Sequence, residues 1–420
     1  MRVSMIVLAA SAALAAGGQP FEETPTFKAS AILPADVVKG PHHKVAETVT
    51  AEGFYQRFHI VSDYGEMDAV GRTVLRTRVS EIDALARLAE VSKTDAFVRG
   101  AGGAILHIGA GLAAVVKDPE GTAKGIGGGL KRFGVNLGRT AKRAADSVIK
   151  DGDKSDDPAS SKKQKALDTA GGAANSVLGV NGAARRWAEK LGVDPYTTNP
   201  VLHQALVDVG KVDAAGSIAT KIALPVSAVV STTATVGGLV WGADPEQVRK
   251  TNEARLAEMG VPKEVAERYL SNGNYTLTSQ TRLIAALHAV KADGCADYVD
   301  AAREAQDERE ALFFVESAEL LAGLHATTPV TAILKDSRAM VAKTGSRAVA
   351  LFPFDWVNWT ETLDKTAREI ATRARQELGA RTLELRISGK ATPAARAGLR
   401  AVGWTVAENA VAGLSVAPAD

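Results

Sequence analysis

The stretch TLELRISGKATPAARAGLRAVGWTV, residues 382–406, carries the pattern of a strand, a helix and a second strand. Apolar and polar side chains alternate over its first six residues, as in a half-buried strand. Thr392 before Pro393 is typical of a helix start, because the hydroxyl can accept a backbone amide and proline is tolerated at the first helical position. The sequence therefore predicts a helix over 392–402 and a short strand over 404–406.

The preceding segments continue this alternation. AVALF at residues 348–352 predicts a strand, and residues 361–377 predict a helix. Strands that alternate with helices favour a partly parallel sheet, so a small α/β unit is expected over 341–420.

Residues 167–340 have an almost wholly helical pattern, with long helices expected over 274–291 and 296–324. Two helix starts combine a capping side chain with proline at the next position, and in the second a glutamine completes a capping box. These starts are Asn199-Pro200 and Asp244-Pro245-Glu246-Gln247.

Residues 25–100 predict a small β-meander followed by a helix. Alternation places Phe54, Phe58 and Ile60 on one face of the meander, and the apolar spacing changes to the helical period over 74–91. The expected fold class is mainly α with α+β parts: an N-terminal β-meander, a helical central domain and a small C-terminal α/β unit.

Residues 1–16 have the features of a secretory signal peptide, with a cation at Arg2, an apolar stretch and an A-x-A-like cleavage site ending at Ala15. A polar, proline-marked lead is expected to follow, up to about Pro41. The mature chain is therefore expected in the periplasm or outside the cell. Cys295 is the only cysteine, so no intramolecular disulfide can form, and a buried or merely tolerated thiol is expected.

The chain has 420 residues, a length that suits two or three domains, and a formal net charge of only +2. Such a balance gives no indication of nucleic-acid binding. Residues 151–166 are dense in charge and poor in apolar side chains, so they are predicted to be a disordered linker.

The region 101–150 is rich in glycine and basic, and its central part, GTAKGIGGGLKRFGVNLGRTAKRAA at 121–145, contains no acidic residue. At about 100° per residue, four apolar side chains fall on one stripe and six cations on the opposite half. This pattern predicts a helix that lies on an anionic surface. The apolar residues are Ile126, Leu130, Phe133 and Leu137, and the cations are Lys124, Lys131, Arg132, Arg139, Lys142 and Arg143.

Two alternatives remain for this stretch: a solvated cationic face on a packed helix, or close packing through Gly121, Gly125 and Gly129. Glycines cost a helix about 1 kcal/mol each against alanine, so a free helix would be unstable in water. A second segment, 222–243, has no charged residue and predicts either a membrane span or a buried helical hairpin. Its proline, threonines and glycines weigh against the span.

No catalytic residue, cofactor site or metal site is predicted. Residues 104–114 resemble a dinucleotide-binding fingerprint, but Asp118 comes too early to be the acid expected about 20 residues further on. Glu316 and Glu319 share a helix face without an accompanying histidine motif, so a solvated or salt-bridged face is expected there. The chain has no GxSxG elbow.

Three segments resemble those of uncharacterised exported proteobacterial proteins, a group with no assigned activity. The resemblance covers most of the mature chain and implies a bacterial envelope protein, but it implies no catalytic residues. The segments are DPYTTNPVL at 194–202, NYTLTSQT at 274–281 and FDWVNWT at 354–360.

The expected function is that of a non-enzymatic periplasmic or secreted envelope protein. It would associate peripherally with an anionic phospholipid or lipopolysaccharide surface, or with an acidic envelope partner, and its oligomeric state stays open. One alternative is a helical assembly factor that oligomerises through the glycine-spaced face. Another is an envelope hydrolase or small-ligand-binding enzyme, with a pocket that collects Tyr196, Asn199, Tyr275, Glu316 or Asp355.

Overall fold

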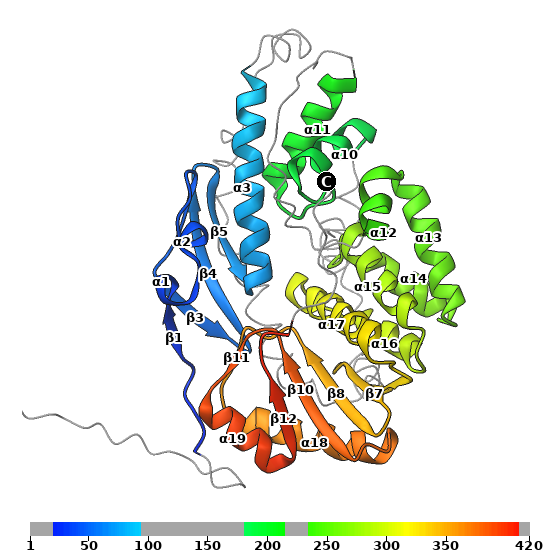
Figure 1. Cartoon of the computed structure of the whole chain (residues 1–420). Coiled ribbons are helices and arrows are strands. Elements are labelled where there is room, and N and C mark those ends of the chain that lie inside the picture. Colours follow the sequence, from blue (N-terminus) through cyan, green and yellow to red (C-terminus); the bar gives the residue numbers. More distant parts are fainter. Residues whose placement is uncertain (1–19, 94–179, 215–233, 411–420) are drawn as a thin grey trace, which may run out of the picture.

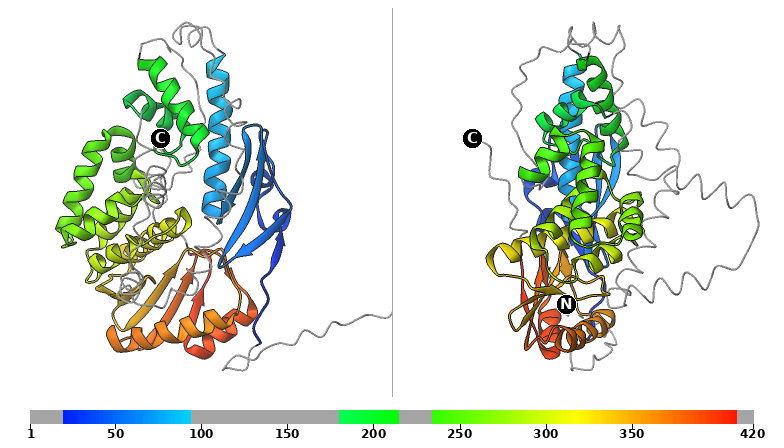
Figure 2. Two further views of the ribbon diagram at one scale, coloured as in Figure 1. Left: turned by 180° about the vertical axis from the view of Figure 1, so that it is seen from behind. Right: turned by 90° about the vertical axis from the view of Figure 1, so that its right-hand side faces the viewer.

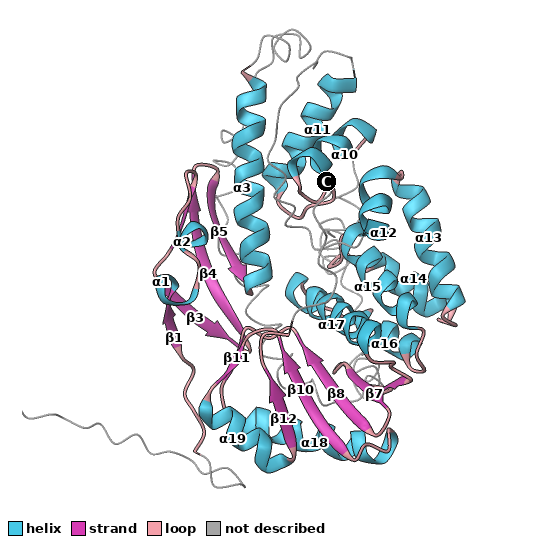
Figure 3. Ribbon diagram, in the orientation of Figure 1, coloured by secondary structure: helices cyan, strands magenta, loops and turns pink. Residues whose placement is uncertain are grey.

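The computed structural model describes residues 20–93, 180–214 and 234–410. Within these ranges helices are combined with two five-stranded sheets and one short strand pair, so the expected mixture of helix and sheet is confirmed (Figure 1 and Figure 3). The predicted signal peptide at 1–16, the basic region at 101–150 and the linker at 151–166 lie outside the described residues.

The N-terminal sheet is wholly antiparallel, and its long strand β4 pairs with β2, β3 and β5. Strands β3, β4 and β5 form the meander that alternation predicted. The expected polar lead was wrong in part, because it contains a strand and two short helices. Elements of three or four residues are too short to show a periodicity. The elements are β1 (Thr26–Lys28), α1 (Ala29–Ile32), α2 (Ala35–Val38), β2 (His43–Val45), β3 (Thr48–Glu52), β4 (Tyr55–Ser62) and β5 (Gly65–Val70).

One side chain of the meander departs from its predicted face. Phe58 and Ile60 are fully buried in a core shared with the following helix, as expected. Phe54 instead lies in the β3–β4 turn, where Gly53 has a φ of 60°, and its ring stacks on Phe354 at a centroid distance of 4.4 Å. The turn interrupts the alternation, so Phe54 packs against the C-terminal part of the chain.

Helix α3 (Arg72–Ser92) stands between the N-terminal strands and the helix at 200–214 (Figure 2). Helices α10 (Gly182–Leu191) and α11 (Pro200–Ala214) pack on its other side and share its core. The predicted cap of α11 is confirmed, because Oδ1 of Asn199 accepts the amides of Val201 and Leu202 at 3.1 and 3.3 Å.

Helices α12 to α16 lie on the right-hand side of Figure 1, and α17 lies beside them nearer the middle. Asp244 caps α13 as predicted, accepting the amides of Glu246 and Gln247 at 3.0 Å each. No helix in the described ranges is long and apolar enough to cross a membrane, and only the end of the 222–243 segment is described, as α12 and a π-helix. The elements are α12 (Ala234–Gly237), η1 (Gly238–Gly242), α13 (Pro245–Glu258), α14 (Lys263–Ser271), α15 (Leu277–Val290), α16 (Cys295–Ala302) and α17 (Glu308–Thr327).

The prediction of a single helix over 296–324 was wrong, because the helix is interrupted between α16 and α17. Asp307 accepts the amide of Glu310 at 2.8 Å and so starts a new helix. The carboxylate of Glu310 in turn accepts the amide of Gln306 at 2.7 Å. Together they satisfy amides that would otherwise have no partner at the start of α17.

The C-terminal sheet has the order β12-β10-β8-β7-β6, with β8, β10 and β12 parallel and β6 and β7 antiparallel. Its predicted strands and helices are confirmed. Strand β6 falls within the region expected to be helical. It was missed because a strand of two residues is too short to show alternation. The elements are β6 (Ala332–Ile333), β7 (Val341–Thr344), β8 (Arg347–Phe352), β9 (Trp356–Val357), α18 (Glu361–Glu377), β10 (Thr382–Ile387), β11 (Lys390–Ala391), α19 (Pro393–Val402) and β12 (Trp404–Ala407).

The largest hydrophobic core contains residues of helices α14 to α17 together with the C-terminal sheet, α18 and α19. Tyr55 and Val70 of the N-terminal sheet belong to the same core. A second core joins that sheet to α3, α10 and α11. The strand-rich ends of the chain are therefore packed through shared apolar side chains.

Candidate functional site

The ten residues expected to bind an anionic surface lie outside the described residues, so the structure brings none of them together. They are Lys124, Ile126, Leu130, Lys131, Arg132, Phe133, Leu137, Arg139, Lys142 and Arg143.

The five residues expected in an enzyme pocket have structural roles instead. Tyr196 and Tyr275 are buried in apolar cores. Asn199 caps α11, and Asp355 accepts an amide at the start of α3. Glu316 forms a buried ion pair with the arginine seven residues earlier in α17. None of the five lines the polar cavity described below.

Asp355 joins three parts of the chain through its carboxylate. Oδ2 accepts the backbone amides of Gln56 and of Arg72, each at 3.1 Å. Burial raises the pKa of Asp355 to about 6, against the opposing effect of these bonds and of nearby arginines. The side chain is fully used in holding the N-terminal sheet, α3 and the C-terminal loop together.

A polar cavity lies where α3, the loop 194–199, the start of α15 and the start of α17 meet. Its empty volume is about 760 Å³, part of which is open to solvent. Apart from two apolar residues, the side chains around it carry hydroxyl, amide, carboxylate or guanidinium groups. The lining residues are Thr73, Val74, Thr77, Arg78, Glu81, Asp194, Thr197, Thr198, Asn274, Thr276, Thr278, Ser279, Arg282, Glu308 and Leu312.

The α3 wall of this cavity is organised by Arg78. Its guanidinium donates to Glu81 and to Thr198, each at 2.8 Å, and reaches Glu308 at 3.4 Å. Glu81 is 2% exposed and also accepts from the hydroxyl of Thr197. These bonds connect α3 to the loop 194–199 and to α17.

The α15 wall is organised by Arg282 and Asp194. Nε and Nη2 of Arg282 donate to the two carboxylate oxygens of Glu319, each at 2.8 Å. Oδ1 of Asp194 accepts the hydroxyl of Thr278 at 2.6 Å and the amide of Tyr196 at 2.8 Å. Burial raises the pKa of Asp194 to about 6, although the bond from Thr278 opposes this.

This arrangement suits the binding of a small polar molecule. The lining combines donors and acceptors, and it includes no histidine or cysteine. In the described part of the chain, no group of three or more His, Cys, Asp and Glu side chains is placed to hold a metal ion.

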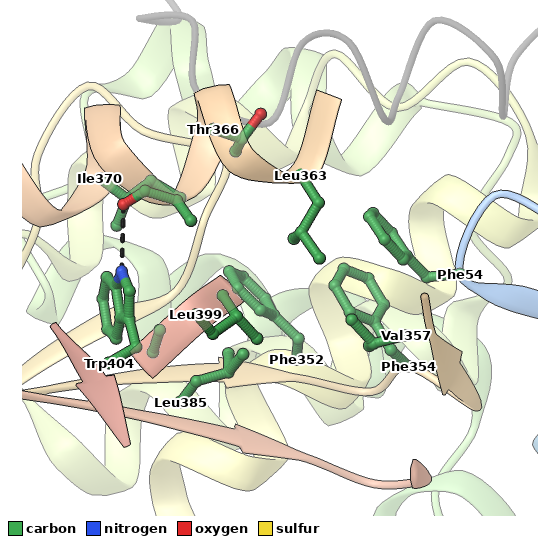
Figure 4. A pocket seen from close by; sticks show the side chains of 12 residues that line it. Phe54, Phe352, Phe354, Val357, Leu363, Thr366, Ile370, Leu385, Leu399 and Trp404 are labelled. Carbon is green, nitrogen blue, oxygen red and sulfur yellow. Dashed lines mark hydrogen bonds between the residues drawn. The ribbon is translucent and has the colours of Figure 1, made fainter. Parts of the chain in front are cut away.

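A second cavity is apolar and lies between the C-terminal sheet and helices α18 and α19 (Figure 4). Its empty volume is about 510 Å³, and Phe54 reaches it from the N-terminal sheet. Phe352 and Phe354 stack at 4.9 Å, while Trp404 Nε1 donates to the carbonyl of Ala367 at 3.0 Å. With almost no polar group to orient a ligand, this space is a loosely filled part of the core.

The structure also shows the surroundings of Cys295 and of the pair Glu316 and Glu319, which the sequence had singled out. Cys295 is buried, as expected, and burial raises the pKa of its thiol to about 11. Glu316 and Glu319 are both buried and paired with arginines, so their shared face is salt-bridged rather than solvated.

Sequence reasoning did not single out Arg78, Glu81, Asp194 or Arg282 as site residues. Charged residues on amphipathic helices usually face solvent, so periodicity contains no signal for a polar cavity. The only pointer was indirect: two of the three segments that carried the resemblance, 194–202 and 274–281, supply seven of the fifteen lining residues.

Comparison with protein-family models, with curated proteins and with solved structures found no match to this chain.

Proposed function

We propose that the protein is an exported, non-enzymatic envelope protein that binds an anionic surface peripherally through residues 121–145. The observation that carries this proposal is the sequence of the stretch, in which six cations and four apolar side chains occupy opposite halves of a helical projection without any acid. Each cation near an anionic bilayer contributes about 1 kcal/mol, so electrostatic attraction dominates at low salt.

The positions of the flanking residues support the proposal. Asn181, just after the segment 94–179, caps α10 and lies against Gly210 near the carboxyl end of α11. The two residues are so close that a Cβ on Gly210 would lie 2.9 Å from Oδ1 of Asn181. Helix α11 begins beside Arg78 of α3, and both helices have their carboxyl ends at the top of Figure 1. The residues that lead into and out of the segment thus lie at one end of the molecule, which is the end we expect to face the surface.

Export and the finer domain layout belong to the same proposal. Residues 1–16 support export, because they combine a cation, an apolar stretch and a small-residue cleavage site. The layout consists of an N-terminal β-meander, a helical middle and a C-terminal α/β unit. Fractionation of cells that make the full chain tests the location directly: cytoplasmic recovery of the protein with residues 1–16 still attached would contradict export.

Co-sedimentation with vesicles tests surface binding. The mature protein is mixed with phosphatidylglycerol vesicles or with phosphatidylcholine vesicles, at low and at high salt. We expect pelleting with the anionic vesicles only, and weaker pelleting as salt screens the charges. Binding that does not depend on salt, or equal binding to both vesicles, would contradict the proposal.

Two variants assign the binding to the stretch. Replacing its six cations with glutamine, or Phe133→Asp, is expected to abolish pelleting. The matched control removes six positive charges from exposed positions elsewhere and should leave pelleting largely intact. Equal losses in both would mean that net charge alone drives association. The control positions are Lys39, Lys44, Lys250, Lys263, Lys365 and Lys390.

A further inference from the structure

Two charged residues that line the polar cavity each have one side-chain atom without a hydrogen-bond partner in the described part of the chain. Asp194 accepts both of its hydrogen bonds on Oδ1, so Oδ2 has no partner among the described residues. Arg282 uses Nε and Nη2 on Glu319, and its Nη1 likewise has no partner within the described ranges. Both residues line the cavity. The lining therefore includes a carboxylate and a guanidinium group that each keep hydrogen-bonding capacity for a ligand.

The balance of charge around the cavity disfavours an anion. Three carboxylates and two guanidinium groups line it. Arg78 is already paired with Glu81 and Glu308, and Arg282 is paired with the buried Glu319. Asp194, by contrast, has no ion pair with any described residue. A positive group beside Asp194 would therefore be stabilised, whereas Arg282 offers a donor whose charge is already balanced and so suits a neutral oxygen.

The rest of the lining suits a ligand with several polar groups. Asn274 uses its side-chain NH₂ on the carbonyl of Ala305 at 2.9 Å, which leaves its Oδ1 as an acceptor. Hydroxyl groups surround the cavity on both walls and can donate or accept. They belong to Thr73, Thr77, Thr197, Thr198, Thr276, Thr278 and Ser279.

We propose that this cavity binds a small amine that also carries hydroxyl groups, an amino alcohol or amino sugar, with its ammonium group on Asp194 and a hydroxyl oxygen on Arg282. The site is independent of residues 121–145 and does not rest on their function. Because Asp194 is largely removed from water, its attraction for an ammonium group is stronger than that of an exposed carboxylate.

Isothermal titration calorimetry of the full mature chain at pH 7 tests the proposal with two matched pairs of probes. Ethanolamine differs from ethylene glycol, and glucosamine from glucose, by an amine in place of a hydroxyl. We expect each amine to bind at least about tenfold more tightly than its neutral counterpart, the difference that one charge-assisted hydrogen bond supplies. Acetate should not bind. If neither amine binds, or if the neutral molecules bind equally well, the proposal is wrong.

Variants locate the binding. Asp194→Asn is expected to weaken ethanolamine binding at least about tenfold, whereas Asp36→Asn, at an exposed position of α2, should not change it. Thr73 lines the cavity but is exposed, so Thr73→Trp narrows the entrance without touching the buried network. The Thr73→Trp variant is expected to abolish ethanolamine binding while its unfolding midpoint stays unchanged. It tests whether the amine binds in this cavity even if Asp194→Asn does not fold. Undiminished binding in a folded Thr73→Trp variant would place the amine elsewhere and overturn the proposal.

Discussion

The carboxylate of Asp355 accepts the backbone amide of Arg72 at 3.1 Å, so a residue near the C-terminal end of the chain caps a helix that begins 283 positions earlier. The residue before that helix is Gly71, with a φ of 98°, and it has no side chain to act as the cap. A Cβ there would also approach Arg309 to 3.0 Å. The local sequence leaves the start of α3 uncapped, and tertiary structure supplies the missing acceptor.

Asp355→Ala should therefore destabilise the whole protein and not only the C-terminal sheet. The amides of Gln56 and Arg72 would lose their acceptor inside the protein, which is expected to lower the free energy of unfolding by about 2 kcal/mol. Urea denaturation followed by circular dichroism measures the change. Glu253→Ala, at an exposed position of α13, serves as the control and should stay within about 0.5 kcal/mol of the wild type. Equal effects of the two substitutions would refute the capping role.

The raised pKa values of Asp194 and Asp355 predict how stability depends on pH. Burial is the main cause that raises the pKa of each carboxyl group from 3.8 to about 6 in the folded protein. The folded state therefore holds these protons more tightly than the unfolded state. Their stabilising contribution is complete below about pH 3.8 and is lost as pH rises through about 6. We expect the fall in unfolding free energy between pH 4.5 and 7 to be smaller in Asp194→Asn by about 1–3 kcal/mol. Urea midpoints at the two pH values measure it, and an unchanged difference would show that Asp194 does not titrate in this range.

The bidentate pair between Arg282 and Glu319 predicts an asymmetric response to substitution. Arg282→Ala leaves Glu319 buried without its partner and is expected to cost about 3–5 kcal/mol. Replacing both residues with leucine removes both charges, so the double variant should be more stable than Arg282→Ala alone. Thermal and urea unfolding measure the series. Lys250→Ala breaks an exposed pair with Glu246 and should cost less than about 1 kcal/mol. A double variant less stable than the single one would mean that the charges themselves are needed.

Gly398 in α19 predicts a steric limit. A Cβ at this position would lie 2.3 Å from Cε2 of Trp359, which is 1% exposed. Gly398→Ala is expected to lower the unfolding free energy by about 1–3 kcal/mol. At Gly238 the same substitution meets nothing within 4 Å, so Gly238→Ala should not destabilise. Thermal melts of the two variants give the comparison.

Local signals in the sequence predicted much of the secondary structure. Caps at Asn199, Asp244 and Thr392 are formed by side chains that accept amides two or three residues further on, so their chemistry is fixed over a few residues. The parallel arrangement of strands β8, β10 and β12 was also expected, because a helix lies between each strand and the next. The break before α17 was also encoded locally, in Asp307 and Glu310, but the continuous apolar spacing on both sides concealed it.

The candidate site was not predictable in the same way. Arg78, Asp194 and Arg282 come from three separate segments, and each has the appearance of an ordinary surface residue on its own element. Their burial follows from how α3, the loop 194–199 and α15 pack together, which no periodicity describes. Asp355 shows the same limit, because its partner amide is set by the tertiary fold alone.

The shared core of Tyr55, Val70 and Phe354 has a consequence for the order in which the chain folds. During synthesis the N-terminal strands and α3 emerge long before residue 355, so they must wait for most of the polypeptide before their last contacts can form. Contacts of such long sequence separation slow folding and prolong the exposure of apolar surface. A chain that ends before residue 354 would lack both the ring that packs edge-on against Tyr55 and the carboxylate that caps α3, so neither contact can guide the early stages of folding.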